Sequence, residues 1–343
     1  NKSVREFDIV TLDRVRKISI QADTDIWLEY AGEKGIHGAI LSYLSLKKEN
    51  FYMVENTVDG KFFVTARGWE DLSEILKSYE ELQVEIGEEL IGEFLQKEEI
   101  ARDFAGYYRL YEKYKSDYQI QEILDGNVTS RQLKTCCDMG KQASFEERFT
   151  VTEMLLEAVT ERISVFQKTD EKTEKLYGNL KLLKVFLQEK NSVEAMEQFI
   201  VSRRKALDAK ICSELLTAEE AAREEEQIRI LEEYFFQLKE LHISDVAEGI
   251  EQIGERFGNV CRLRNEKLEE TKKMLEQAFS FLEECFGEGQ ELLLFETGLT
   301  GDDRCSIFIS QYGCPSYFKH CELLLYSKKE NELRKECRDL LEE

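Results

Sequence analysis

Two arginines stand where a guanidinium group can serve phosphate chemistry. Arg14 lies in Thr11-Leu-Asp-Arg-Val, directly before an alternating apolar and polar run at 15–20, and Arg67 lies in Thr65-Ala-Arg-Gly-Trp, directly before an expected helix start. An arginine remains ionised and its planar fork makes bidentate contacts, so it suits the charge that spreads over a transferring γ-phosphoryl group. Residue type alone favours the other interpretation, in which both are ordinary surface or capping arginines.

The sequence lacks the other parts of a nucleotide-phosphate site. The phosphate-cradling loop G-x-x-x-x-G-K-[ST] does not occur, because Gly-Lys is found only at 60–61 and 140–141, where Phe62 and Gln142 follow it. An apolar strand ending in Asp-Glu, needed for Mg²⁺, is also missing, since the run at 292–296 ends in a lone glutamate. We therefore expect this chain alone to hold neither ATP nor Mg²⁺ and to be inactive as an ATP hydrolase.

The histidines and cysteines do not have the spacing of a metal site. His37, His242 and His320 lie far apart, and the nine cysteines are scattered without a C-x-x-C pair. His320 with Cys314 and Cys321 is conceivable as a metal site, but the spacing of those two cysteines is not one that zinc sites use. We interpret the cysteines as reduced thiols that fill a core, and we expect His37 to start or pack a helix.

The charge argues against several kinds of partner. Of the 343 residues, 70 are Asp or Glu and 47 are Lys or Arg, which gives a net charge of −23. A body this acidic repels phosphate backbones and anionic lipid, so we expect neither nucleic acid nor a membrane as a partner. No apolar run approaches the roughly 20 residues that span a bilayer, and no signal-peptide pattern opens the chain. These observations favour a cytoplasmic protein.

The elements that must position the two arginines are mostly helices. Proline occurs once and glycine only 19 times, which favours long helices with short connections. A strand is expected at 15–20, and two short extended pieces are expected around a turn at 58–61. Helices are expected at 24–35, 36–48, 65–79, 88–96 and 98–114, and longer ones at 145–168, 171–190, 192–213, 218–241, 243–257 and 259–286. For 291–312, strand and helix interpretations compete.

Two further stretches admit either a binding or a packing interpretation. The aromatic side chains from Phe94 to Tyr118 could stack bases, but the surrounding charge is balanced rather than basic. Packing between helices is therefore the favoured explanation for them. The acidic block Glu219–Gln227 is either a solvated helix face or an exposed arm that engages a partner.

The surroundings of both arginines resemble segments of one ATPase family. Leu12-Asp-Arg-Val, followed by a strand, resembles the L-D-R-F segment near the end of the AAA+ core in MoxR-type ATPases. Thr65-Ala-Arg-Gly, opening a helix, resembles the S-P-R segment where that family keeps its sensor-2 arginine, although Thr-Ala here replaces Ser-Pro. Residues 63–73 and Gly35-Ile-His-Gly look like a bacterial MoxR-like subgroup with a long helical C-terminus.

The resemblance covers residues 1–125 and implies a fold and two roles. It implies a mostly α fold with the end of an AAA+ α/β core at 1–21, a helical lid at 22–125 and a long-helix extension with a mixed tail at 126–343. A small β contribution is expected near the N- and C-terminal parts. Arg14 matches the arginine finger that acts in trans on the neighbouring subunit's nucleotide. Arg67 matches the sensor-2 arginine that contacts the phosphates of ATP.

The resemblance also implies a parent protein. The chain begins with Asn1 rather than Met, so we expect it to be the truncated C-terminal part of a protein whose P-loop, acidic Mg²⁺ strand and sensor-1 segment precede it. Family membership implies ATP and Mg²⁺ in that parent and a homo-oligomeric ring of six subunits. It also implies chaperone-like remodelling or maturation of client proteins, with von Willebrand A domain proteins among them.

Two alternatives stay open beside this interpretation. The first is a nucleotide-independent acidic helical scaffold for protein–protein interaction. The negative net charge and the long helices are also typical of such a scaffold. The second and weaker one is a metal–thiol redox protein that uses the C-terminal cysteines.

Overall fold

The computed structural model describes residue 14 and the ranges 21–57, 60–187 and 192–321. Its content is 82% helix and 3% strand, which confirms the mostly α fold class with a minor β contribution. The chain divides into two compact units, residues 1–118 and 119–343. This division falls seven residues before the expected end of the lid at 125, at Gln119, whose φ of 51° interrupts the helical path.

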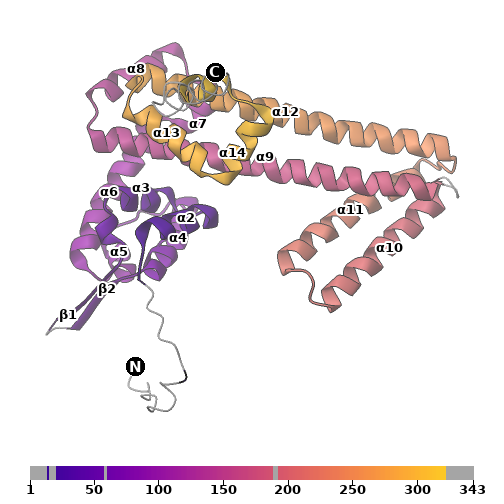
Figure 1. The fold of residues 1–343 in the computed structure, drawn as a ribbon, viewed down its shortest axis with the longest axis horizontal. Coiled ribbons are helices and arrows are strands. Elements are labelled where there is room, and N and C mark those ends of the chain that lie inside the picture. Colours follow the sequence, from indigo (N-terminus) through magenta and orange to yellow (C-terminus); the bar gives the residue numbers. More distant parts are fainter. Residues whose placement is uncertain (1–13, 15–20, 58–59, 188–191, 322–343) are drawn as a thin grey trace, which may run out of the picture. The chain divides into compact units, whose positions relative to one another are not determined.

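The first unit is a small helical bundle with a β-hairpin (Figure 1). In chain order its elements are α2 (Thr24–Lys34), α3 (Gly38–Leu46), η1 (Lys48–Asn50), β1 (Met53–Thr57), β2 (Gly60–Val64), α4 (Ala66–Glu81), α5 (Glu88–Phe94) and α6 (Glu98–Tyr118). The start of α2 is set by Asp23, whose carboxylate accepts hydrogen bonds from the backbone amides of Asp25 and Ile26. Its end is set by Gly35, which takes a left-handed conformation with φ of 67°.

The core of this unit is aromatic. Tyr43, Trp69 and Phe104 are fully buried, and their ring centroids lie 5.1 to 5.8 Å apart. The Trp69 indole donates a hydrogen bond to the carbonyl of Phe51 at 3.1 Å, so its polar edge is satisfied inside the core. The expectation that the aromatic stripe of the 94–118 stretch packs helices is confirmed for Phe104, Tyr108, Tyr111 and Tyr118, which are all buried.

The hairpin pairs β1 and β2 antiparallel, with Met53 opposite Val64 and Thr57 opposite Gly60. This confirms the two extended pieces expected around a turn, although residues 58–59 of that turn lie outside the described residues. The strand expected at 15–20 also lies outside them. In the C-terminal part, where a further β contribution was expected, residues 192–321 contain no strand.

The second unit is built from helices of very different lengths. They are α7 (Ile120–Asp125), α8 (Ser130–Gln142), α9 (Phe145–Leu187), α10 (Ser192–Cys212), α11 (Ala218–Glu240), α12 (Val246–Phe286), α13 (Gln290–Gly301), α14 (Asp303–Tyr312) and α15 (Pro315–Cys321). The stretch 291–312, for which strand and helix competed, is therefore helical. The breaks expected at 169–170 and at 258 are wrong, because α9 and α12 each continue through them as one helix.

The long helices α9 and α12 lie side by side and run antiparallel (Figure 1). Tyr177 of α9 stacks on Phe257 of α12, and Asp170 pairs with Arg264 further along. Residue numbers therefore decrease along α9 in the direction in which they increase along α12. At one end of the pair, α10 and α11 form a hairpin. A core of buried residues from all four helices, including Leu183, Phe199, Leu231 and Ile253, holds this end together.

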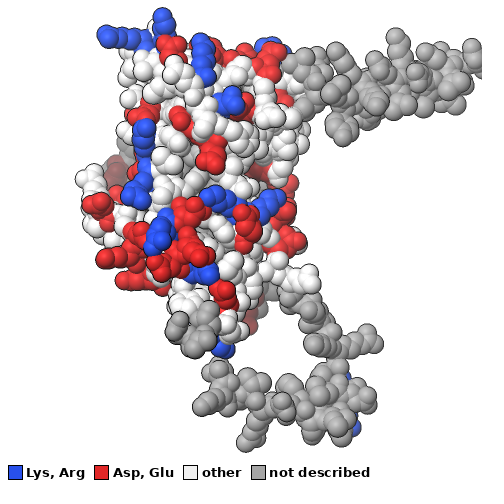
Figure 2. All heavy atoms as spheres, turned by 90° about the vertical axis from the view of Figure 1, so that its left-hand side faces the viewer, with Lys and Arg blue, Asp and Glu red and all other residues white. Residues whose placement is uncertain are grey.

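The charge on the surface and the apolar character of the helices are relevant to the expectation that neither nucleic acid nor a membrane is a partner. Figure 2 shows acidic and basic side chains interleaved over the face that it presents, with acidic side chains gathered most densely at its lower left. Among the described residues, no helix combines the length and the apolar character that crossing a bilayer requires.

Candidate functional site

Arg67 occupies the first turn of α4, and the local sequence explains why its side chain points outward. Thr65 caps the helix by accepting a hydrogen bond from the amide of Gly68 at 3.3 Å. Trp69 and Leu72 then lie on the face that is buried in the core. Since Arg67 precedes Trp69 by two positions, it falls on the opposite side of the helix.

The guanidinium of Arg67 is accessible. Its side chain is 88% exposed, and it forms an ion pair across one helical turn with Asp71, from Nε to Oδ2 at 3.7 Å. Exposed pairs of this kind contribute little to stability, so the guanidinium can exchange the carboxylate for another anion at small cost. The first helical turn also carries the positive end of the helix dipole, which favours an anion there.

A close approach of two helices fixes the place of this turn. A Cβ added to Gly68 would lie 2.9 Å from the backbone carbonyl oxygen of Phe94, so the end of α5 lies directly against the start of α4. Only glycine leaves room for that contact. The segment that carries Arg67 is therefore held on both sides, by its cap and by α5.

Arg14 is exposed, and residues 1–13 and 15–20 on either side of it lie outside the described residues. The geometry between Arg14 and Arg67 is therefore not part of the described structure. Within residue 14 and the ranges 21–57, 60–187 and 192–321, no group of three or more His, Cys, Asp and Glu side chains is placed to hold a metal ion. Of the two arginines, Arg67 is the one whose surroundings the structure describes, and it presents an exposed cation at the start of α4.

His37 begins α3, as expected. Its Nδ1 accepts a hydrogen bond from the amide of Ala39 at 3.1 Å, and its Nε2 lies 2.8 Å from Oε1 of Glu80. Tyr108 donates to the same Glu80 oxygen at 2.9 Å, and Lys115 approaches the other at 3.1 Å. This group ties α3, α4 and α6 together, so His37 has a structural role here.

His320 and Cys314, considered as parts of a metal site, form hydrogen bonds with different carboxylates. Nε2 of His320 forms a hydrogen bond with the carboxylate of Glu283, and the His320 ring stacks on Phe279. Cys314 instead donates its thiol hydrogen to Glu276 at 3.3 Å. The interpretation of the cysteines as core thiols is confirmed for the five that are buried, and it is wrong for Cys212, which is exposed. Cys337 lies outside the described residues.

The second candidate site is a groove of about 680 Å³ between α11 and α12. One face of each helix lines it, and the lining positions repeat at intervals of three and four residues. These residues are Glu233, Phe236, Gln237 and Glu240 on α11, and Gln252, Glu255, Arg256 and Asn259 on α12. The groove therefore follows two helical turns, which is about 10 Å of helix length.

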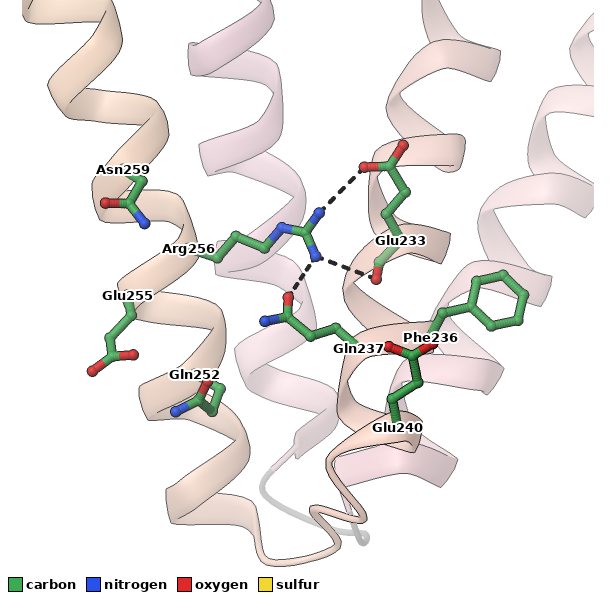
Figure 3. A pocket seen from close by; sticks show the side chains of 8 residues that line it. All are labelled: Glu233, Phe236, Gln237, Glu240, Gln252, Glu255, Arg256 and Asn259. Carbon is green, nitrogen blue, oxygen red and sulfur yellow. Dashed lines mark hydrogen bonds and ion pairs between the residues drawn. The ribbon is translucent and has the colours of Figure 1, made fainter.

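Arg256 spans the groove, as Figure 3 shows. It donates to the amide oxygen of Gln237 at 2.5 Å and to the backbone carbonyl of Glu233 at 3.4 Å, and it pairs with the Glu233 carboxylate at 3.4 Å. Its guanidinium lies 4.7 Å from the ring centroid of Tyr234, which is a cation–π distance. The positive charge of Arg256 is thus compensated within the groove. The exposed carboxylates of Glu240 and Glu255 then give the groove a net negative charge.

The sequence interpretation missed this groove. A signal was present in the positions 233, 236, 237 and 240 and in 252, 255, 256 and 259, which have the spacing of one helix face. The spacing shows which residues share a face, but the pairing of α11 with α12 brings the two faces together.

The acidic block 219–227 was considered as an exposed arm, but several of its glutamates form contacts within the second unit. Glu220 completes a capping box with Thr217 at the start of α11. Glu224 and Glu226 form ion pairs with Lys210 on α10 and Lys172 on α9, at 2.6 and 2.9 Å. The block therefore helps to seat α11 against its neighbours.

Comparison of the chain with protein-family models, with curated proteins and with solved structures gave no match.

Proposed function

We propose that this chain is the C-terminal part of a MoxR-type AAA+ ATPase, with its first unit serving as the nucleotide-sensing lid. The observation that carries the proposal is the position of Arg67, an accessible guanidinium in the first turn of α4 beside the cap residue Thr65. A sensor arginine must reach a phosphate from a rigid support, and α4 is anchored in the core through Trp69. The resemblance of the segment around Arg67 to the sensor-2 segment of the family supports the same assignment.

In the parent protein, ATP with Mg²⁺ binds between the core and the lid, and Arg67 exchanges its pairing with Asp71 for the γ-phosphate. Arg14 reaches the nucleotide of the adjacent subunit in a six-membered ring. Closure of the lid around the nucleotide moves the helical extension, which acts on client proteins such as those with von Willebrand A domains. Mg²⁺ bound together with ATP would neutralise charge on the phosphates.

The test is ATP hydrolysis by the longer protein with Arg67→Ala. Loss of a preorganised donor to the transferring group should lower kcat about a hundredfold, with nucleotide affinity much less affected. Arg262→Ala is the matched control, because Arg262 is also exposed, at 68%, and also pairs with a carboxylate four residues on, Glu266, at 3.9 Å. Hydrolysis in the control should stay unchanged.

Equal loss in both variants would overturn the assignment of Arg67, and a gene without a P-loop segment upstream would overturn the ATPase proposal as a whole. In the same assay, Arg14→Ala should abolish hydrolysis and leave ATP binding intact. Loss of binding would show that Arg14 has another role.

The groove between α11 and α12 favours a second candidate function, a scaffold that binds a partner without nucleotide. Its exposed carboxylates, Glu240 and Glu255, suit a basic helical segment, since a third helix can lie between two antiparallel ones. A scaffold of this kind would bind its partner in the presence or absence of ATP.

Binding of a fluorescent amphipathic peptide rich in lysine and leucine, measured by anisotropy, tests the groove. Glu240→Lys with Glu255→Lys should weaken binding about tenfold, because the rim charges then repel the peptide. Glu225→Lys with Glu270→Lys changes the net charge equally at exposed positions outside the groove and should leave the affinity close to that of the unmodified chain. The same loss in both variants would mean that the peptide responds only to overall charge.

A further inference from the structure

Two adjacent cysteines of α8 face the C-terminal end of α12. Cys136 and Cys137 are 4% and 7% exposed, and Gly140 follows them by one turn on the same helix. A Cβ added to Gly140 would lie 2.8 Å from the ring of Phe286 and 3.6 Å from the carbonyl oxygen of Cys285. The turn of α8 that carries both cysteines therefore lies directly against residues 285 and 286.

A third thiol approaches from the α12 side. Cys285 is 2% exposed, and its thiol is within hydrogen-bond reach of the Cys137 thiol. Burial, followed by the contact with Cys137, raises the pKa of Cys285 well above the ordinary thiol range. Cys285 thus has a sulfur neighbour on α8 and lies in a closed environment.

We propose that Cys137 and Cys285 form a redox-sensitive thiol pair that closes to a disulfide and links α8 to the end of α12. The contact between the two thiols means that a modest shift of α8 brings them to bonding distance. α8 is only 13 residues long, with a non-helical segment on either side, and can make that shift more easily than the 41-residue α12.

Three other described cysteines have surroundings of a different kind. Cys305 contacts the hydroxyl of Thr160, Cys314 donates to Glu276, and Cys212 is exposed on α10. Cys136 and Cys137 cannot pair with each other inside a helix, because adjacent side chains diverge by about 100° around its axis. Cys136 is therefore the natural internal control for Cys137.

The oxidant is a peroxide. The Cys137 thiolate attacks the O–O bond of hydrogen peroxide, which gives a sulfenic acid and hydroxide. The Cys285 thiolate then attacks that sulfur, the S–S bond forms, and the sulfenic oxygen leaves as hydroxide. The two protons lost by the thiols convert both hydroxides to water, so two thiols lose two electrons and one peroxide becomes two water molecules. Because the pKa of Cys285 is raised, the second step should be slow and should accelerate as the pH rises.

The experiment treats the reduced full chain with hydrogen peroxide, blocks the remaining thiols with N-ethylmaleimide and maps disulfides by mass spectrometry without reduction. The expected product is an intramolecular cross-link between the peptides of Cys137 and Cys285 that dithiothreitol reverses. Cys136→Ser and Cys212→Ser should leave its yield unchanged, and Cys137→Ser should abolish it. The oxidised unmodified chain should also have a higher Tm than oxidised Cys137→Ser.

The mapping on the unmodified chain decides the question even where a variant folds poorly. A cross-link through Cys136, or peroxide that modifies Cys212 and leaves Cys137 and Cys285 as free thiols, would overturn the proposal.

Discussion

At the scale of single residues, Glu80 has the most telling environment in the first unit. Burial alone would raise the pKa of this carboxyl. The hydrogen bond and charge of His37, the charge of Lys115 and the hydrogen bond from Tyr108 outweigh burial and lower the pKa from 4.5 to about 2. The folded state therefore favours the ionised carboxylate more than the unfolded state does.

Glu80→Gln should lower the free energy of unfolding by about 2 kcal/mol at pH 7, because the charge is removed from three partners. The folded pKa is depressed, so the contribution of Glu80 is fully present above about pH 4.5 and is lost as the pH falls toward 2. Urea denaturation of both proteins from pH 7 to pH 3 should show the two stabilities converging at the acid end.

Glu81→Gln is the control, since Glu81 is the next residue on α4 and is exposed. It should change stability by no more than about 0.5 kcal/mol at any of these pH values. A gap between the Glu80 variant and the unmodified protein that stays constant with pH would show that the carboxylate charge is not what stabilises this site.

The contacts of Glu80 also show what sequence can and cannot predict at this scale. Asp23, Gly35 and Thr65 were predictable as helix start and stop residues, because a cap acts on its own neighbours in the chain. The partners of Glu80 come from positions 28 to 43 residues away, on α3 and α6. Only the packing of those helices brings them together.

At the scale of elements, replacing two glycines of the first unit by alanine should change the stability of the protein in opposite directions. Gly68→Ala should destabilise the protein by about 1 to 3 kcal/mol, because the new Cβ would meet the rigid carbonyl of Phe94. Gly106→Ala, within α6, should stabilise it by about 0.5 to 1 kcal/mol, since no atom lies within 4 Å and alanine favours a helix. Thermal denaturation of both variants measures the two signs.

A Gly68→Ala variant as stable as the unmodified protein would mean that α5 can move away from the start of α4. In that case, Arg67 would lack the fixed support assigned to it. The Gly106 variant serves as the control for the general effect of replacing a helical glycine.

The long helices show why some expected boundaries were wrong. The expected helices end at 168 and 257 and begin again at 171 and 259, and the residues between them include Asp170 and Gly258, which weaken helices on average. In the structure, no atom lies near the missing Cβ of Gly258, and Asp170 accepts hydrogen bonds from Arg264 at 2.7 Å and Tyr312 at 2.9 Å. Packing along both long helices overrides the local preference, and sequence periodicity does not record that packing.

At the scale of the whole molecule, the predominance of helix followed from composition, whereas the meeting points of distant segments did not. The scarcity of proline and the helical spacing of apolar residues predicted the fold class. The exposed setting of Arg67 is a local matter, because Arg67 lies two residues before the buried Trp69 on the same helix. The groove at Arg256 and the thiol contact of Cys285 depend on which helices lie side by side.

The antiparallel course of α9 and α12 has a consequence for the order of folding. Tyr177 and Phe257 meet near the α10–α11 hairpin, whereas Asp170 and Arg264 meet further from it, across 94 residues of chain. Once the hairpin forms from local contacts, each later pairing closes only a short additional loop, so the entropy lost per contact is small. We therefore expect the two long helices to zip together from the hairpin outward, and the contact of α8 with residue 285 to be among the last to form.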